Sequence, residues 1–136
     1  ITYGKPYRKG REIFGALVPY GKVWRTGANE ATEITSTGNF MFGGKFVKAG
    51  TYSLFTIPKE KSWTIILNKA VGQFGAFEYD RTQDILRVEF PVNASEDRVD
   101  FLIDFSPSTK EKEVILFFWW GSPKNVTEKK CIKLQL

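Results

Sequence analysis

The fold is decided by the stretch Ala49-Gly50-Thr51-Tyr52-Ser53-Leu54-Phe55-Thr56-Ile57-Pro58. A turn formed by Lys48-Ala49-Gly50 comes before it, and Pro58 opens a polar turn after it. Between these turns, apolar side chains occupy both faces of the alternating strand pattern. Because a strand with two apolar faces is typical of the interior of a sheet, the stretch predicts a central strand from Thr51 to Ile57.

Further strand patterns lie on both sides of this stretch, with turn residues between them. Phe40 and Phe42 alternate before Gly43-Gly44, and Lys45-Phe46-Val47 follows, which predicts a hairpin with a two-residue turn. Other strands are expected at 2–6, 30–36, 63–67, 86–90, 99–105, 114–120 and 132–136. The pattern predicts a single all-β domain over residues 1–136, an antiparallel β-sandwich of about nine strands, with a closed β-barrel as the alternative.

The connection from Asn68 to Asp84 is the longest irregular segment of the pattern. It contains two glycines and several aromatic residues, among them Phe74, Phe77 and Tyr79. Loops of this length in a compact domain are often functional, so a functional role is one prediction. The alternative is that its aromatic side chains form a lid over one end of the core.

Length and composition exclude several classes of protein. The 136 residues suffice for one domain, and the net charge of +5 comes from basic residues that are densest near the two ends. Those basic clusters also contain Glu12 and Glu128 and lack an aromatic stacking platform, so we predict a solvated surface and no nucleic acid partner. No apolar run approaches the roughly 18 residues of a membrane span.

The twelve residues from Gly21 to Thr32 read Gly-Lys-Val-Trp-Arg-Thr-Gly-Ala-Asn-Glu-Ala-Thr and allow two interpretations. Trp24, Arg25, Asn29 and Glu30 offer an aromatic ring, a bidentate cation, an amide and a carboxylate, which suits a polar ligand site. Alternatively, the same groups tie an irregular connection to the sheet, with Arg25 paired to Glu30 and Asn29 bonded to the local backbone.

The motif from Gly21 to Thr32 and the motif from Ala49 to Pro58 resemble those of a bacterial family known only as a domain of unknown function. The resemblance extends to Trp63 to Lys69, Gly75-Ala76 and Asp84 to Val88. Its members typically read GKVWRTGANEAT, AGTYSLFTIP, WTVIxNK, QWGA, YD and DVLRV, and Phe74 stands here where the family usually has tryptophan. The resemblance implies a small β-rich domain with no assigned activity. It also implies an export signal, so an exported, periplasmic or cell-surface location is expected; the start at Ile1, without Met, suggests a processed or trimmed chain.

The sequence lacks the residues on which many enzymes depend. It has no histidine, its single cysteine, Cys131, reads as a passive strand residue, and no Gly-rich phosphate loop occurs. What remains is carboxylate chemistry, for which Glu30, Glu78, Asp80 and Asp84 are the available acids. We therefore expect no catalytic residue, no metal site and no cofactor, and we favour a protein that is not an enzyme.

Three functions remain open, and the first is preferred. It is a non-enzymatic binding module for a small polar ligand or glycan, with ligand-binding residues Trp24, Arg25, Asn29, Glu30, Tyr52, Trp63, Phe74 and Asp80. The second is a structural or protein-interaction domain that uses a sheet face or edge. The third is a hydrolase in which Glu30 acts with Asp80 or Asp84. No particular oligomeric state is predicted.

Overall fold

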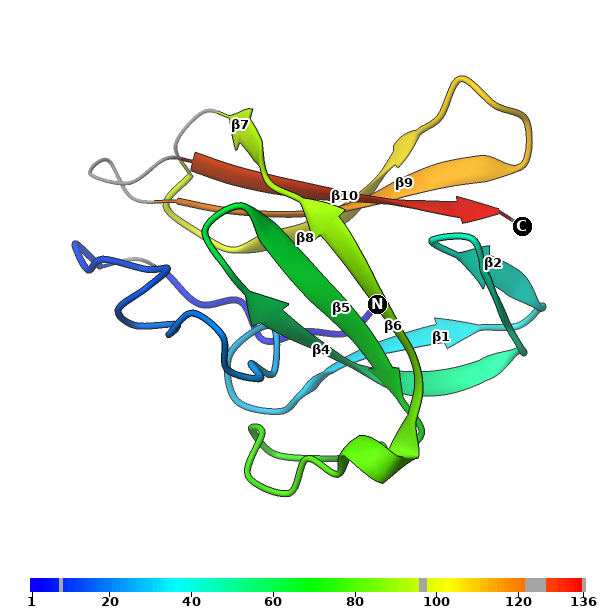
Figure 1. Cartoon of the computed structure of the whole chain (residues 1–136), viewed down its shortest axis with the longest axis horizontal. Helices are drawn as coiled ribbons and strands as arrows, with labels where there is room; N and C mark the ends of the chain where they lie inside the picture. The colour runs from blue at the N-terminus through cyan, green and yellow to red at the C-terminus, as the bar shows by residue number, and fades with distance from the viewer. Residues whose placement is uncertain (8, 96–97, 122–126, 136) are drawn as a thin grey trace.

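Two antiparallel β-sheets form the described part of the chain (Figure 1). The structure, a computed structural model, describes all residues except 8, 96–97, 122–126 and 136, and describes the main chain alone at 93–95 and 127–135. Its elements are β1 (Thr32–Ser36), β2 (Phe40–Phe42), β3 (Lys45–Val47), β4 (Gly50–Pro58), β5 (Ser62–Asn68), the 3-10 turn η1 (Arg81–Gln83), β6 (Asp84–Pro91), β7 (Asn93–Ser95), β8 (Leu102–Pro107), β9 (Glu113–Trp120) and β10 (Thr127–Gln135). The all-β prediction is confirmed.

The first sheet has the strand order β1-β4-β5-β6, with β4 and β5 inside it. Leu54 of β4 pairs with Thr32 of β1 on one side and with Leu67 of β5 on the other. Leu54, Phe55, Ile66 and Leu67 are all fully buried, because both faces of these two strands are covered. The prediction of a central strand from Thr51 to Ile57 is confirmed.

The second sheet has the strand order β3-β2-β10-β9-β8, and β7 also pairs with β10. At its edge, β2 and β3 form a hairpin through Gly43 and Gly44, whose φ angles are 56° and 83°. Two successive residues with positive φ match the twist of a two-residue hairpin turn, and glycine adopts such angles without steric cost. The hairpin expected from Gly43-Gly44 is thus confirmed.

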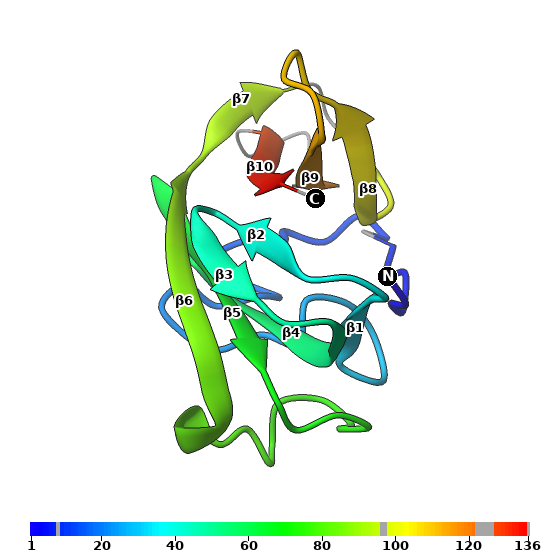
Figure 2. The same cartoon turned by 90° about the vertical axis from the view of Figure 1, so that its right-hand side faces the viewer.

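The two sheets stack as layers, and different segments close the two sides between them (Figure 2). On one side β6 runs out of the first sheet and continues into β7, which joins the second. On the other side lies the N-terminal segment. Because neither sheet closes on itself within the described residues, the fold is the predicted sandwich and the barrel alternative is wrong.

The N-terminal segment connects the two sheets by main-chain hydrogen bonds. Thr2 exchanges bonds of 3.0 and 2.9 Å with Glu33 of β1, and the Phe101 N–H donates to the Pro6 carbonyl across the gap at 3.0 Å. Gly4 accepts from the Ala28 N–H at 2.9 Å, and a Cβ at position 4 would collide with the Ala28 carbonyl. The edge strand expected at 2–6 is therefore reduced to isolated pairs, which suffice to hold this segment over the open side.

An aromatic cluster fills the core beneath this segment. Phe14 lies edge-on to three tryptophan rings, at centroid distances of 6.1 Å from Trp24, 4.9 Å from Trp63 and 6.2 Å from Trp120. Ile13, Phe14 and Val18 are all buried. They belong to a tight turn in which the Val18 N–H donates to the Ile13 carbonyl at 2.9 Å. Aromatic pairs in such edge-to-face geometry add to the stabilisation from buried area.

No helix in the described part of the chain has the length and apolar character that a membrane crossing requires. The predicted role of the Cys131 side chain lies outside the described residues. The main chain at Cys131 belongs to β10 and pairs with Phe117 of β9.

The β2–β3 hairpin offers a matched test of the packing. Phe42 is fully buried and Phe46 is 61% exposed, although they lie four residues apart in one hairpin. Phe42→Ala should lower the free energy of unfolding by about 3–5 kcal/mol, because it leaves a cavity in the core, and Phe46→Ala by less than about 1 kcal/mol. Urea unfolding followed by tryptophan fluorescence measures both values. Equal losses in the two variants would contradict the assigned faces of the hairpin.

Candidate functional site

Residues Gly21 to Trp24 extend the first sheet beyond the end of β1. The Trp24 N–H donates to the Thr56 carbonyl at 2.7 Å, and the Thr56 N–H donates back to Trp24 at 3.0 Å. The Gly21 N–H bonds to the Pro58 carbonyl at 2.8 Å. These bonds satisfy main-chain groups of β4 that lie beyond its pairing with β1, and they place the Trp24 ring in the aromatic cluster.

Threonine side chains hold the loop that follows Trp24. The buried Thr26 hydroxyl bonds to the Trp24 carbonyl and to the Thr56 hydroxyl, each at 3.1 Å, and the Thr32 hydroxyl donates to the Thr26 carbonyl at 2.8 Å. The Thr32 N–H closes the loop on the Arg25 carbonyl at 3.1 Å. The structural ties of this loop are therefore made by threonines and main chain.

Thr26 also carries local strain. Its φ of 61° is rare for a β-branched residue and costs on the order of 1–3 kcal/mol unless the surroundings enforce it. Here three hydrogen bonds through its hydroxyl and carbonyl enforce it. Such strained positions are concentrated at functional sites, and Thr26 directly follows Arg25.

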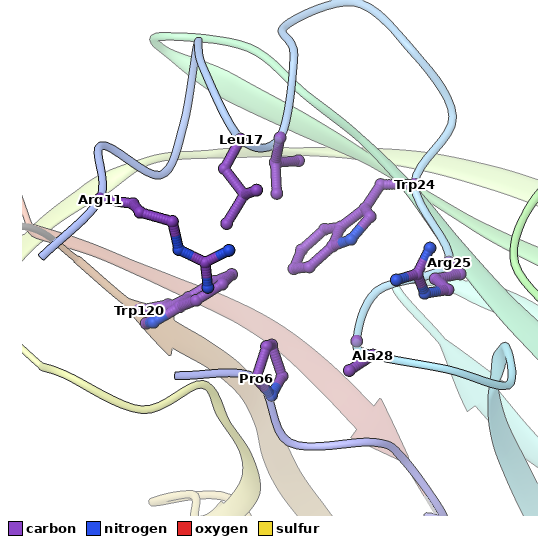
Figure 3. Close-up of a pocket in the computed structure, with 9 residues that line it drawn as sticks. Pro6, Arg11, Leu17, Trp24, Arg25, Ala28 and Trp120 are labelled. Carbon is purple, nitrogen blue, oxygen red and sulfur yellow. The ribbon is translucent and has the colours of Figure 1, made fainter. Parts of the chain in front are cut away.

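A cavity of about 260 Å³ lies between this loop and the N-terminal segment (Figure 3). Its lining is about equally polar and apolar, and the apolar part comes from Pro6, Leu17, Val18, Trp24 and Trp120. The Trp24 and Trp120 rings are nearly parallel, at 6.2 Å between centroids and 17° between planes. Trp120 is fixed, because it is 1% exposed and its indole N–H donates to the Val99 carbonyl at 2.9 Å.

The polar lining of the cavity comes from Arg11, Arg25 and the loop residues Gly27 and Ala28. Figure 3 shows the two guanidinium groups on opposite sides of the cavity. Arg11 donates to the Tyr7 carbonyl at 2.8 Å. The Nε of Arg25, in contrast, is buried and has no hydrogen-bond partner among the described residues. A buried donor without a partner is uncommon and costs roughly 1–3 kcal/mol, more when charged.

The structure separates Asn29 and Glu30 from this cavity. Both are exposed and lie against the long loop between β5 and β6, where the Gly75 N–H donates to the Asn29 carbonyl at 3.1 Å and Glu30 pairs with Phe74. Asn29 has a φ of 65°, which turns the chain towards that loop. The ion pair between Arg25 and Glu30, expected under the structural interpretation, is not among the ion pairs of the described residues.

The remaining predicted ligand residues are dispersed. Trp63 is 1% exposed within the core, and Phe74 is exposed on the β5–β6 loop. The Tyr52 hydroxyl donates to the Lys48 carbonyl at 2.8 Å beside the β3–β4 turn. Asp80 caps η1, where hydrogen bonds from the Thr82 side chain and main chain lower the pKa of its carboxyl. Of the predicted residues, the cavity therefore brings together Trp24 and Arg25.

Arg11 and Trp120 are cavity residues that the sequence did not point to. Trp120 reads as one more apolar residue of a buried strand, and its contact with Trp24 depends on how the two sheets stack. Arg11 stood among the basic residues assigned to a solvated face. No local pattern signals either role, because both arise from segments far apart in the chain.

The β5–β6 loop is anchored by a polar network around Asp84. Its carboxylate accepts from the Tyr79 hydroxyl at 2.6 Å, from Arg87 Nε at 2.9 Å and from Asn68 Nδ2 at 2.9 Å. The Tyr79 ring packs edge-on against the buried Phe55 at 5.0 Å. Burial and the bond to Asp84 raise the pKa of Tyr79 to about 12. Tyr79 thus packs on the core as the lid expectation stated, whereas Phe74 and Phe77 of the same loop are exposed.

The acids of this loop do not reach a cavity. No carboxylate of the described residues lines the cavity at Arg25. None lines a second cavity, of about 270 Å³, which lies between Ile34, Phe40 and Val114. Among the described residues no three or more acidic or sulfur-containing side chains are grouped as metal ligands. The cavity at Arg25 therefore combines positive charge with apolar walls, which suits retention of a polar molecule more than acid–base chemistry.

The fold and this cavity define a small antiparallel β-sandwich protein with one cationic, aromatic-walled cavity at the open side of the sheets. The chain belongs to the family described as "Protein of unknown function (DUF2911)", whose model matches residues 1–127. The resemblance to a family of unknown function is thereby confirmed. No curated protein matches the chain, and no solved structure does.

The Tyr79 network gives a prediction about alkaline unfolding. A phenol whose pKa rises on folding contributes stability that is fully present below its unfolded pKa, about 10, and that is lost as the pH rises through its folded pKa, about 12. Between pH 10 and 12, the free energy of unfolding should therefore fall more for the unaltered chain than for Tyr79→Phe. The difference between the two urea-unfolding series isolates this residue from the lysines that titrate in the same range.

Absorbance at 295 nm serves as the control for this prediction. It should show one tyrosine of the folded chain that ionises late, and that step should disappear in Tyr79→Phe. Parallel stability curves for the two proteins would contradict the role assigned to Tyr79.

Proposed function

We propose that this chain is a non-enzymatic binding module that holds a small polar ligand in the cavity between Trp24, Arg25 and Trp120. The carrying observation is that Arg25 lines the cavity while its Nε, covered by the protein, has no hydrogen-bond partner among the described residues. Other residues make the structural ties of its loop, so the guanidinium is left available to a ligand. A concavity that combines apolar walls with a few placed polar groups is usual for a small-molecule site.

The binding function is favoured over a hydrolase by the positions of the acids. Asp84 is engaged by Tyr79, Asn68 and Arg87, and Asp80 caps η1. Glu30 is exposed and belongs to the surface beside Phe74. General acid–base hydrolysis needs two carboxyl groups facing one substrate, and neither cavity supplies a carboxylate.

The ligand class follows the sequence expectation of a small polar molecule, with a single sugar unit as one member. An aromatic face together with a fixed polar group is suited to sugars as well as to other small polar molecules. The exported, periplasmic or cell-surface location implied by the family resemblance forms part of the same proposal.

A second candidate function, protein interaction, is favoured by the β5–β6 loop. Val71, Phe74 and Phe77 of this loop are exposed, Phe77 by 87%, and exposed aromatic side chains are enriched at protein interfaces. This function would leave the cavity without a ligand. A screen of ligands against cavity variants therefore distinguishes the two candidates.

We expect a thermal-shift screen of sugars, small acids and amides to give at least one compound that raises the melting temperature. A ligand that binds the native state alone stabilises it by about 2.7 kcal/mol at a concentration of 100 times its dissociation constant. Arg25→Ala should abolish the shift, because the guanidinium lines the cavity. The same compound should quench tryptophan fluorescence, since Trp24 and Trp120 form the walls.

Arg81→Ala is the matched control. Arg81 is an exposed arginine of η1, outside the cavity lining, so its replacement should leave the shift unchanged. A shift that persists in Arg25→Ala would refute the proposed site. Absence of any shift, with strong destabilisation by Arg25→Ala but not by Arg81→Ala, would make Arg25 a structural residue and would favour the interaction function.

A further inference from the structure

We propose that the ligand of this cavity is a small organic carboxylate with an apolar body. This inference rests on the proposed function and narrows its ligand class. Three features of the cavity carry it: the sign of its charge, the geometry of its available donor and the character of its walls.

Charge is the first feature. The charged side chains that line the cavity, Arg11 and Arg25, are both cationic. Asp100, which forms a bridge with Tyr7 of the N-terminal segment, is neutralised by Lys5 Nζ at 3.3 Å and by Arg98 Nε at 3.1 Å. A cavity with one sign of charge and low-dielectric walls concentrates its field and selects ligands of the opposite sign. An anion is therefore favoured over a neutral or cationic molecule.

The donor geometry is the second feature. Arg25 lines the cavity with a planar fork of N–H donors, of which Nε is covered by the protein and has no acceptor among the described residues. A carboxylate accepts two parallel N–H bonds from such a fork, and these charge-assisted bonds are about twice as strong as neutral ones. The main chain of Arg25 is held before binding by Thr32 and by the strained Thr26, which limits the entropy lost when a ligand binds.

The walls are the third feature. Trp24, Trp120, Leu17, Val18 and Pro6 line the cavity beside the two arginines, so a ligand would meet an apolar wall as well as polar groups. An inorganic anion would leave these walls uncovered, whereas the body of an organic acid would bury them. The volume of about 260 Å³ lies just below the roughly 300–1,000 Å³ of sites for drug-sized ligands, which restricts the ligand to a small acid.

Matched probes test the inference on the unaltered chain. Benzoate and benzamide have the same shape and differ in charge, and 3-methylbutanoate and 3-methylbutanamide form an aliphatic pair. By isothermal titration at pH 7, we expect each carboxylate to bind at least about tenfold more tightly than its amide, because the amide lacks the charge-assisted pair. Inorganic phosphate should bind more weakly than benzoate. Since no variant is needed, this comparison does not depend on the folding of an altered protein.

The variant Arg25→Gln tests whether Arg25 recognises the negative charge of the ligand. Glutamine keeps a polar donor without the positive fork, so the variant should bind benzoate and benzamide with nearly equal affinity. Arg81→Gln, the matched control outside the cavity, should keep the tenfold preference. Melting temperatures of both variants, measured without probe, report whether they fold.

The outcomes separate this inference from the proposed function. If benzamide or glucose binds as tightly as benzoate, and Trp24→Ala weakens that binding, the cavity is a ligand site but the carboxylate preference is overturned. Tight binding of inorganic phosphate without binding of benzoate would overturn the inference that the ligand has an apolar body. If no probe binds, both the inference and the proposed function fail. A preference for carboxylates that survives in Arg25→Gln would overturn the role of Arg25.

Discussion

The reciprocal main-chain pair between Trp24 and Thr56 is the constraint on which the site depends. Its two hydrogen bonds, of 2.7 and 3.0 Å, fix the segment before the loop onto the edge of β4, at a residue beyond those that pair with β1. This pair places both Trp24 and its neighbour Arg25 at the wall of the cavity. The Trp24 ring also packs against the aromatic cluster.

Threonines make the structural ties within the motif. Thr26 and Thr32 satisfy the main chain of the loop with their hydroxyls, and Thr26 accepts a φ of 61° while doing so. Arg25, located between Trp24 and Thr26, contributes only its carbonyl to these ties. Within the described residues, the structural ties of the motif are thus made by threonines and main chain, without the Arg25–Glu30 pair that the structural interpretation expected. The ligand-site interpretation of Arg25 stays a prediction.

Those parts of the fold that depend on local pattern were predictable from the sequence. The central strand, the Gly43-Gly44 hairpin and the long connection after Asn68 follow from alternation and turn residues, which act over a few positions. Of the residues that line the cavity, the sequence pointed to Trp24 and Arg25. Asn29 stands four residues from Arg25 in the sequence, yet its positive φ directs it to the β5–β6 loop. Trp120 completes the cavity through sheet stacking, which no local pattern encodes.

The position of the cavity follows from how the sandwich is closed. On the side of β6 and β7, the chain passes directly from one sheet into the other. On the opposite side the closure is an irregular segment held at Thr2, Gly4 and Pro6 by main-chain bonds. The cavity at Arg25 lies against this irregular segment, which contributes Pro6 to its lining. In that space the protein has placed two arginines against two tryptophans, where apolar residues would have filled the core. The covered Nε of Arg25, which has no hydrogen-bond partner among the described residues, costs stability at this place.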